Sequence, residues 1–122
     1  MTLDSNIVIA YLAGDKAVVE TLLRWKEGGK ILFLPAIVES EVLSFPNMTT
    51  EERRCTEEFL DSLNFVAFDK TMARVSADIR RNVNIKFPDA AIAATALAVH
   101  SPLVTRNVRD FKKIIGLAIV AI

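Results

Sequence analysis

The N-terminal stretch MTLDSNIVIAYL (residues 1–12) contains the pattern that decides the fold. A short apolar start, Met1–Leu3, leads to Asp4 and then to an apolar run that begins at Ile7. Asp, Ser and Asn are common helix N-caps, so this pattern predicts a brief strand that passes directly into a helix. The carboxyl end of an inner strand is also where ligands bind in open α/β sheets. Asp4 is therefore either a helix cap or a site residue.

The rest of the chain repeats this alternation of short apolar runs and helical segments. Strands are expected over residues 1–3, 31–34, 64–68, 102–105 and 117–122. Helices are expected over residues 5–12, 16–27, 35–45, 50–63, 70–84, 88–99 and 109–114. Strands that alternate with helices indicate a parallel sheet covered on both faces. We therefore expect a single α/β domain over residues 1–122, with three α/β/α layers and a central, mainly parallel five-stranded sheet.

The composition excludes several classes of protein. The 122 residues include 15 basic and 15 acidic side chains, so the formal net charge is zero and no strongly basic coat is present. One cysteine, Cys55, cannot form an intrachain disulfide, and one Cys with one His cannot build a zinc cluster. The apolar stretch 114–122 is too short for a membrane-spanning helix of about 20 residues. We expect a soluble cytoplasmic domain without a leader peptide or a membrane partner.

Two glutamates in PAIVESEVLSF (residues 35–45) have different expected environments. On a helix with roughly 100° per residue, Glu41 lies inside the apolar arc and Glu39 faces outward. The residues that define the arc are Ile37, Val38, Val42 and Phe45. A carboxylate within an apolar stripe is costly unless it is paired with a cation or bound to a metal. Glu41 is therefore a candidate metal ligand or the partner of an arginine, and Glu39 is a surface residue.

The segment FPDAAIAATALAV (residues 87–99) predicts a helix that is apolar on every side and therefore buried. Its one charge, Asp89, lies in the first turn, where the helix dipole stabilises an anion. Asp89 is thus either a dipole partner or a site residue. His100 lies at the other end of this helix, roughly 16 Å from Asp89 at 1.5 Å per residue, so we expect a cap or surface residue and not a catalytic base.

The segment PLVTRNVRDF (residues 102–111) ends a strand and then places polar side chains in a loop. Thr105 and Asn107 follow the strand, and Asp110 either caps the short helix or joins the site. Strand carboxyl ends and helix N-termini share one edge of a parallel sheet, so Asp4, Asp89 and this loop are expected to meet there. Glu41 can join them only if its helix leans across the site. Four cations form a local positive patch here: Arg106, Arg109, Lys112 and Lys113.

Four segments, LDSNIVIAYL, PAIVESEVL, FPDAAIAATALA and PLVTRNVRDF, resemble in order and spacing the signature blocks of PIN domains. The resemblance covers the whole chain and is closest to the VapC toxin ribonucleases. It implies a Rossmann-like PIN fold and an endoribonuclease that depends on Mg²⁺, with Mn²⁺ as an alternative. Matched block by block, the metal-binding catalytic acids are Asp4, Glu41, Asp89 and Asp110. The residues expected to hydrogen-bond these ligands or the substrate are Asn6, Thr105 and Asn107.

Two features depart from the family pattern. Many members carry an aspartate at the position of Asn107, so either Asp110 or Asn107 fills the fourth position of the site. Few residues precede the first block, which implies a short first strand or an incomplete start.

The resemblance implies a toxin that is neutralised by a cognate antitoxin, with RNA phosphates contacted by the four cations of residues 106–113. The alternatives are a structure-specific PIN nuclease without a toxin role and a non-catalytic RNA-binding module. We also expect a homodimer, with helices 16–27 and 50–63 as candidates for the interface because they carry Trp25 and Phe59.

Overall fold

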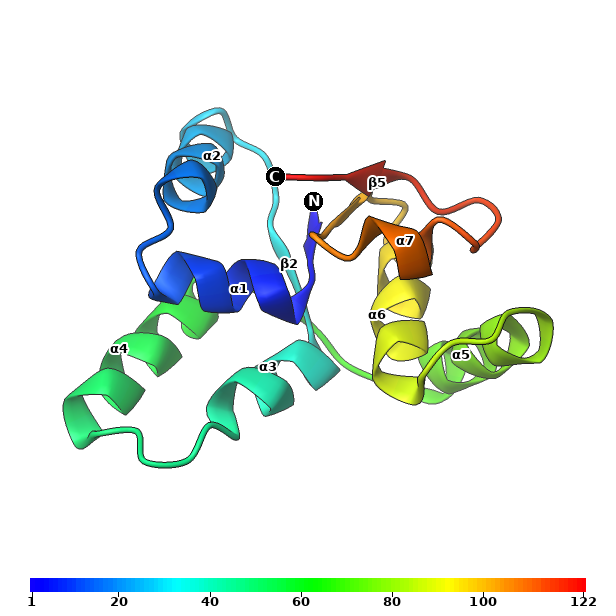
Figure 1. Ribbon diagram of the computed structural model, residues 1–122, viewed down its shortest axis with the longest axis horizontal. Coiled ribbons are helices and arrows are strands. Elements are labelled where there is room, and N and C mark those ends of the chain that lie inside the picture. The colour runs from blue at the N-terminus through cyan, green and yellow to red at the C-terminus, as the bar shows by residue number, and fades with distance from the viewer.

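A five-stranded, all-parallel sheet forms the centre of the molecule in the computed structural model, which describes residues 1–122 (Figure 1). The strands are β1 (Thr2–Leu3), β2 (Phe33–Pro35), β3 (Asn64–Val66), β4 (Leu103–Val104) and β5 (Ile119–Val120). Their order is β3-β2-β1-β4-β5, and every pairing is parallel. The direction of winding reverses between β1 and β4, and ligands bind at such a switch point in open α/β sheets.

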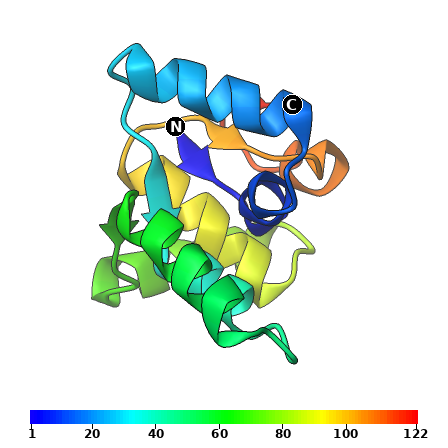
Figure 2. The same cartoon turned by 90° about the vertical axis from the view of Figure 1, so that its left-hand side faces the viewer.

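Seven helices cover the two faces of this sheet. They are α1 (Ser5–Leu12), α2 (Lys16–Glu27), α3 (Ala36–Leu43), α4 (Thr50–Asp61), α5 (Lys70–Asn82), α6 (Phe87–Ala98) and α7 (Val108–Phe111). Helices α1 to α4 lie on one side of the strands and α5 to α7 on the other (Figure 1). The view in Figure 2 shows α2 and α4 in front of the strands and α6 behind them. The expected three-layer α/β/α fold is confirmed.

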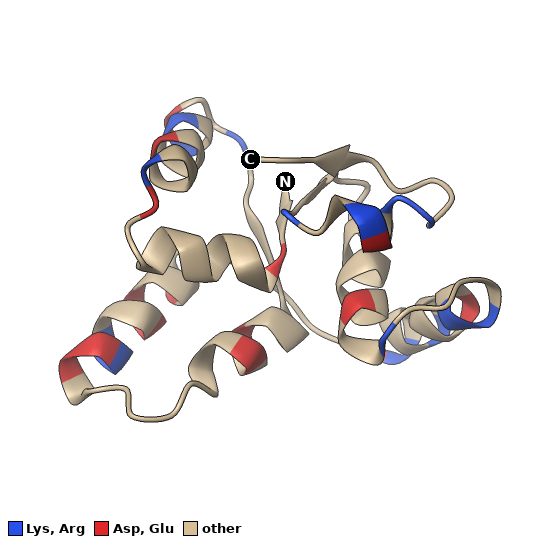
Figure 3. Ribbon diagram, in the orientation of Figure 1, with Lys and Arg blue, Asp and Glu red and all other residues tan.

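Helix α6 is buried along most of its length, as its apolar sequence predicts. Residues Ala90 to Ala96 are all buried. The one charged residue of the helix, Asp89, lies in its first turn, and the acidic position of α6 is red in Figure 3. His100 follows the helix with a φ of 53° and is exposed, as expected for a residue just beyond a helix end.

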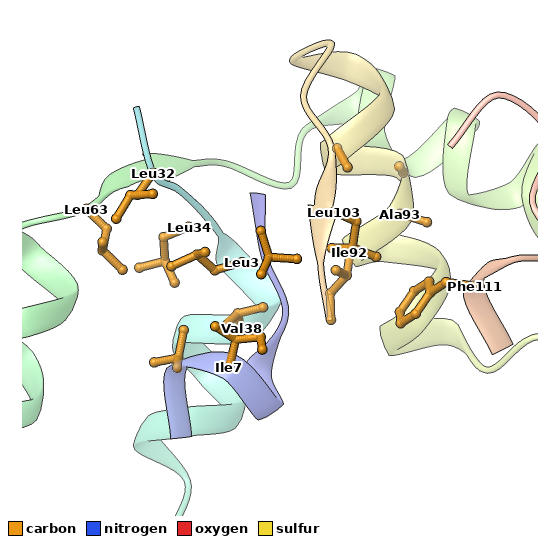
Figure 4. Packing of buried hydrophobic residues seen from close by; sticks show 14 of the residues in the cluster. Leu3, Ile7, Leu32, Leu34, Val38, Leu63, Ile92, Ala93, Leu103 and Phe111 are labelled. Carbon is orange, nitrogen blue, oxygen red and sulfur yellow. The ribbon is translucent and has the colours of Figure 1, made fainter. Parts of the chain in front are cut away.

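The core forms where side chains from the strands meet those of the helices on both faces. Figure 4 shows Leu3, Leu34 and Leu103 of the sheet between two sets of helix residues. Ile7 and Val38 pack from one side, and Ile92, Ala93 and Phe111 from the other. Each fully buried leucine or isoleucine contributes roughly 1.5–3 kcal/mol. This packing fixes the strand ends that carry Asp4 and Thr105.

The helix starts lie where the sequence predicts them. Thr49 accepts from the Glu52 amide at 3.0 Å and Glu52 accepts from the Thr49 amide at 3.3 Å, so the two residues form a capping box at the start of α4. Asp69 caps α5 by accepting from the Met72 amide at 3.0 Å. Pro35 is an exception, because it ends β2 and is the N-cap of α3 and not part of its first turn.

The buried face of α3 lies at a different angle around the helix axis from the predicted apolar arc. Val38 and Val42 are buried as expected, but Phe45 is 49% exposed because the helix ends at Leu43 and the periodicity stops there. The buried stripe therefore centres on the two valines. Glu39 and Glu41 flank it on opposite sides, and both are half-buried. The prediction that Glu39 faces outward is thus also wrong.

The core-facing side of α4 is formed by two of its residues. Thr56 and Leu60 are buried, whereas Cys55 is exposed. Phe59, a candidate for a dimer interface, stacks on Tyr11 of α1 with ring centroids 4.0 Å apart and an interplanar angle of 13°. Its ring therefore belongs to the packing of this chain. None of the helices combines the length and the apolar character needed to cross a bilayer.

Candidate active site

Asp4 combines the two roles that its sequence position allows. It follows β1, is the N-cap of α1, and is only 4% exposed. One carboxylate oxygen, Oδ1, accepts from the Ser5 amide at 2.7 Å. The other, Oδ2, accepts from the Thr105 hydroxyl at 2.6 Å. Burial raises the pKa of Asp4, and these hydrogen bonds, which stabilise the ionised form, oppose that rise.

A chain of hydrogen bonds extends from Asp4 into the loop after β4. Thr105 is fully buried, and its Oγ1 accepts from the Asn107 amide at 2.9 Å. The Asn107 side chain donates to Asp110 Oδ2 at 3.0 Å, which lowers the pKa of Asp110, with further help from Arg109 and Lys113. Asp110 lies inside α7, whose N-cap is Asn107, so the alternative in which Asp110 caps this helix is wrong.

Glu41 reaches the same edge through Ser5. The Ser5 hydroxyl donates to Glu41 Oε1 at 3.1 Å and lies 3.4 Å from Asp4 Oδ1. Helix α3 therefore leans across the site, which is the condition that Glu41 had to meet. Ser5 is a site residue that sequence reasoning missed, because its position after Asp4 was explained by helix capping. Glu39 forms no side-chain hydrogen bond and no ion pair.

Asp89 is a half-buried carboxylate without a hydrogen-bond partner. Burial raises its pKa first, and the negative charges of Asp4, Asp110 and Glu41 raise it further, in that order. An aspartate that only complemented a helix dipole would have the opposite shift. The carboxylate therefore shares one electrostatic environment with the three other acids that the sequence singles out.

Asn6 and Arg106 connect the elements around these acids. Asn6 Oδ1 accepts from the Arg106 amide at 3.4 Å. The Arg106 guanidinium donates to Asp15 Oδ2 at 2.8 Å and to the Ile122 carbonyl at 3.2 Å. Arg106 thus ties the loop after β4 to the start of α2 and to residue 122.

The sequence profile described as PIN domain matches residues 1–117. The chain belongs to the PIN domain family. Ribonuclease VapC1 of Rickettsia felis is 25% identical over a 137-residue alignment that covers 100% of this chain and 96% of the relative. The resemblance carried by the four sequence blocks is confirmed.

Solved structures of the family share the fold of this PIN domain. A toxin–antitoxin complex from Klebsiella pneumoniae contains a chain with a TM-score of 0.82 and 27% identity, with 96% of this chain and 94% of that chain covered. DNA-bound VapBC from Salmonella typhimurium gives a TM-score of 0.84 at 21% identity, with 98% and 96% covered. The second likeness shows the fold alone.

The acids of this PIN domain fit a hard divalent cation by their chemistry. Asp4, Glu41 and Asp89 form no ion pair with Lys or Arg. As the side chains stand, no three of them are close enough together to enclose an ion. Mg²⁺ binds through one or two carboxylates and keeps several waters, so an open set of oxygen donors suits it. A closed cage of side chains is not required.

A polar cleft lies along two of these acids. It has a volume of about 540 Å³ and is lined by Arg80, Asn84, Ile85, Lys86, Asp89, Asn107, Asp110 and Lys113. A second hollow, an apolar groove of about 520 Å³, lies between α1, α4 and the segment that joins α3 to α4. Only the polar cleft includes site acids in its lining.

Proposed function

We propose that this PIN domain is a metal-dependent endoribonuclease that hydrolyses RNA phosphodiester bonds as the toxin of a toxin–antitoxin pair. The observation that carries the proposal is the gathering of four acids at one edge of the sheet. Hydrogen bonds link Asp4 through Ser5 to Glu41 and through Thr105 and Asn107 to Asp110. Burial and the charges of these three acids raise the pKa of Asp89. A site that concentrates negative charge in this way is stabilised by binding a cation. The name of the relative ribonuclease VapC1 supports RNA as the substrate, and the toxin–antitoxin complex from Klebsiella pneumoniae supports an antitoxin as the partner.

In this mechanism, Asp4 and Asp89 are the principal ligands of Mg²⁺, or of Mn²⁺ as an alternative. Glu41 and Asp110 complete the site directly or through water. Bound Mg²⁺ supplies a water of lowered pKa and neutralises charge on the phosphodiester. An RNA substrate places this activity in the cytoplasm.

The neutral polar residues hold the acids in position. The Thr105 and Ser5 hydroxyls donate to Asp4 and Glu41, so both carboxylates keep a fixed orientation. Asn107 fixes Asp110 and favours its ionised form. Loss of an outer hydrogen bond of this kind typically lowers metal affinity or activity roughly 10- to 100-fold. We therefore propose Asp110 as the fourth acid and Asn107 as its support.

The positive side chains of the loop after β4 divide into two groups. Arg109, Lys112 and Lys113 are exposed and are proposed to contact RNA phosphates. Arg106 was expected to act with them, but its guanidinium is engaged by Asp15 and the Ile122 carbonyl. We therefore propose that Arg106 positions the loop that carries Thr105 and Asn107.

We also propose a homodimer. Large apolar side chains remain exposed on this chain, among them Leu23 of α2 at 44%, Ile31 at 53% and Phe65 of β3 at 54%. Burying such side chains between two copies is favourable by about 25 cal/mol per Å² of apolar area. Light scattering of the purified protein at micromolar concentration, without antitoxin, should give the mass of two chains. A monomer under these conditions would contradict the proposal.

The substitution Asp89→Asn tests the proposed catalytic role. We expect it to stop RNA cleavage, to remove the Mg²⁺-induced rise in melting temperature, and to leave the metal-free fold unchanged or more stable. Melting curves in chelator and in Mg²⁺, with cleavage of total RNA measured in parallel, provide the readouts. Asp61→Asn is the matched control, since Asp61 is exposed and lies outside the site.

A purely structural Asp89 gives a different pattern. If it only complemented the helix dipole, the variant would lose about 0.3–1 kcal/mol with or without Mg²⁺ and would still cut RNA. That result would rule out the proposed role of Asp89 in catalysis.

A further inference from the structure

The polar cleft extends from the site acids toward α5 and is lined mainly by positive and amide side chains. Arg80, Lys86 and Lys113 contribute three cations, and Ile85 is the one apolar residue of the lining. None of the three cations forms an ion pair with Asp or Glu. Positive side chains that share a hollow and form no ion pair attract an anionic ligand.

The fold itself brings these three cations together. Arg80 lies in the last turn of α5, Lys86 is the N-cap of α6, and Lys113 follows α7. In the extended segment between α5 and α6, buried Ile85 alternates with exposed Asn84 and Lys86. Because Ile85 anchors the segment in the core, its two polar neighbours face the cleft.

Cations of the cleft lie next to the site acids as well as farther along the cleft. Asp89 and Asp110 line the same cleft as the three cations, with Lys86 three residues before Asp89 and Lys113 three residues after Asp110. The positive lining thus continues up to the proposed reaction centre.

The opposite flank of the site carries no positive charge. Helix α1 has no charged residue, and the charged residues of α3 are Glu39 and Glu41. Figure 3 shows this contrast: blue segments lie on α5, on the connection to α6 and around α7, whereas α1 and α3 show none. A polyanionic strand is therefore attracted to the acids from the side of α5 and α7.

We propose that Arg80, Lys86 and Lys113 bind consecutive phosphates of a single RNA strand on one side of the scissile bond. This inference rests on the proposed nuclease function and adds a direction to it, because the backbone enters along α5 and the start of α6. The amides of Asn84 and Asn107 can donate to phosphate or sugar oxygens in the same cleft. The lining contains no aromatic ring on which bases could stack, so this contact reads the backbone and not the sequence.

The test is the salt dependence of RNA binding. A fluorescein-labelled single-stranded RNA is titrated with the full chain in chelator, and anisotropy gives Kobs at several NaCl concentrations. For single strands, each neutralised phosphate contributes roughly −0.7 to the slope of log Kobs against log salt. Arg80→Gln/Lys86→Gln should therefore make the slope shallower by about 1.4 and weaken binding roughly 25-fold at about 0.1 M salt.

A matched variant controls for the loss of two charges. Arg24→Gln/Arg74→Gln removes two exposed arginines of α2 and α5 that form no ion pair and lie outside the cleft. It should keep nearly the wild-type slope. The charge-conserving variant Arg80→Lys/Lys86→Arg should restore the wild-type slope, which would show that charge, and not altered folding, causes the effect.

The possible outcomes separate this inference from the proposed function. If wild type binds RNA and both double Gln variants have the same slope, the phosphate track is refuted while the nuclease proposal stands. If wild type does not bind RNA, both proposals fail. Single-stranded DNA of the same sequence is the second ligand: a slope change with DNA alone would identify a DNA site and overturn the inference.

Discussion

Two hollows of nearly equal size differ in almost every property that matters for function. The apolar groove has a volume of about 520 Å³, and seven of its twelve lining residues are hydrophobic. The polar cleft has about 540 Å³ and one hydrophobic residue among eight. The groove can gain free energy only by burying hydrocarbon. The cleft adjoins carboxylates whose charge is costly to keep, and a bound cation offsets that cost.

Volume does not distinguish the two hollows, whereas the charge of their linings does. The groove exists because α3 ends at Leu43 and leaves Phe45 partly exposed beside α1 and α4. The cleft exists because the start of α6 and the loop after β4 meet at the carboxyl edge of the sheet. Helix α3 contributes to both the set of acids and the groove, because Glu41 bonds to Ser5 and Val42 lines the groove. Substitutions along this one helix can therefore test the comparison.

The largest effect is expected at Glu41. Glu41→Gln should abolish RNA cleavage, because it removes a charge from the set of acids, and Glu39→Gln should leave cleavage nearly intact. Both glutamates are half-buried on the same helix, so burial is matched between the two variants. Phe45→Ser, on the groove side, should also leave cleavage intact. Cleavage rates on one RNA substrate decide the matter, and equal losses in the two glutamate variants would refute the assignment.

A smaller effect is expected at Ser5, the residue that links Asp4 to Glu41. Ser5→Ala removes the hydroxyl but keeps the backbone amide that Asp4 accepts from. We expect cleavage to fall roughly 10- to 100-fold, as for other outer hydrogen bonds at metal sites. Ser44→Ala is the control, since the Ser44 hydroxyl bonds only to the Glu41 carbonyl at the end of α3. A Ser5 variant with wild-type Mg²⁺ dependence and rate would show that the link has no role.

The pH dependence of stability should distinguish Asp89 from Asp110. The folded pKa of Asp89 is raised above 3.8, so its contribution to stability is present below that pH and is lost as pH rises through the folded pKa. In chelator, Asp89→Asn should thus melt above wild type near neutral pH, and the difference should vanish in acid. The pKa of Asp110 is lowered, so Asp110→Asn should instead melt below wild type near neutral pH. Shifts of the same sign would contradict this reading.

The smallest effect is expected from the pair of Arg106 and Asp15, which is partly exposed at 40% and 31%. A double-mutant cycle with Arg106→Gln and Asp15→Asn should give a small favourable coupling in unfolding experiments, because solvent screens this partly exposed pair. If Arg106 served as a phosphate contact, the single variant would instead weaken RNA binding and reduce its salt dependence. A coupling energy near zero, together with weaker RNA binding, would place Arg106 among the residues that contact RNA phosphates.

The fold and the positions of the principal acids could be predicted from the sequence because the signals are local. Asp4 follows a strand and Asp89 opens a buried helix, and both signals lie within a few residues of the side chain concerned. Ser5 was missed because helix capping already explained a polar residue after Asp4. The predicted outward orientation of Glu39 was wrong because the spacing of the apolar residues does not show that α3 ends at Leu43.

The partners of the cations could not be predicted, because they depend on distant segments. Asp15 lies 91 residues before Arg106 along the chain, and no local pattern connects the two. Arg80 was not singled out as a residue of the cleft, because its proximity to Asp89 requires α5 to pack along α6. The role of a charged residue on a helix surface can be inferred only when the residues on the opposite side of the cleft are known.

The double role of Asp4 has an evolutionary consequence. Its side chain begins a helix and also carries a charge of the site, so two separate selective pressures act on one codon. Asn, Ser or Thr satisfies the first pressure, because each caps helices, but brings no charge. Asp89 caps no helix, so only the charge of its carboxylate would keep an aspartate at this position under selection. In a lineage that lacked the proposed nuclease activity, position 89 should therefore diversify early, while position 4 should remain restricted to the small set of helix-capping residues.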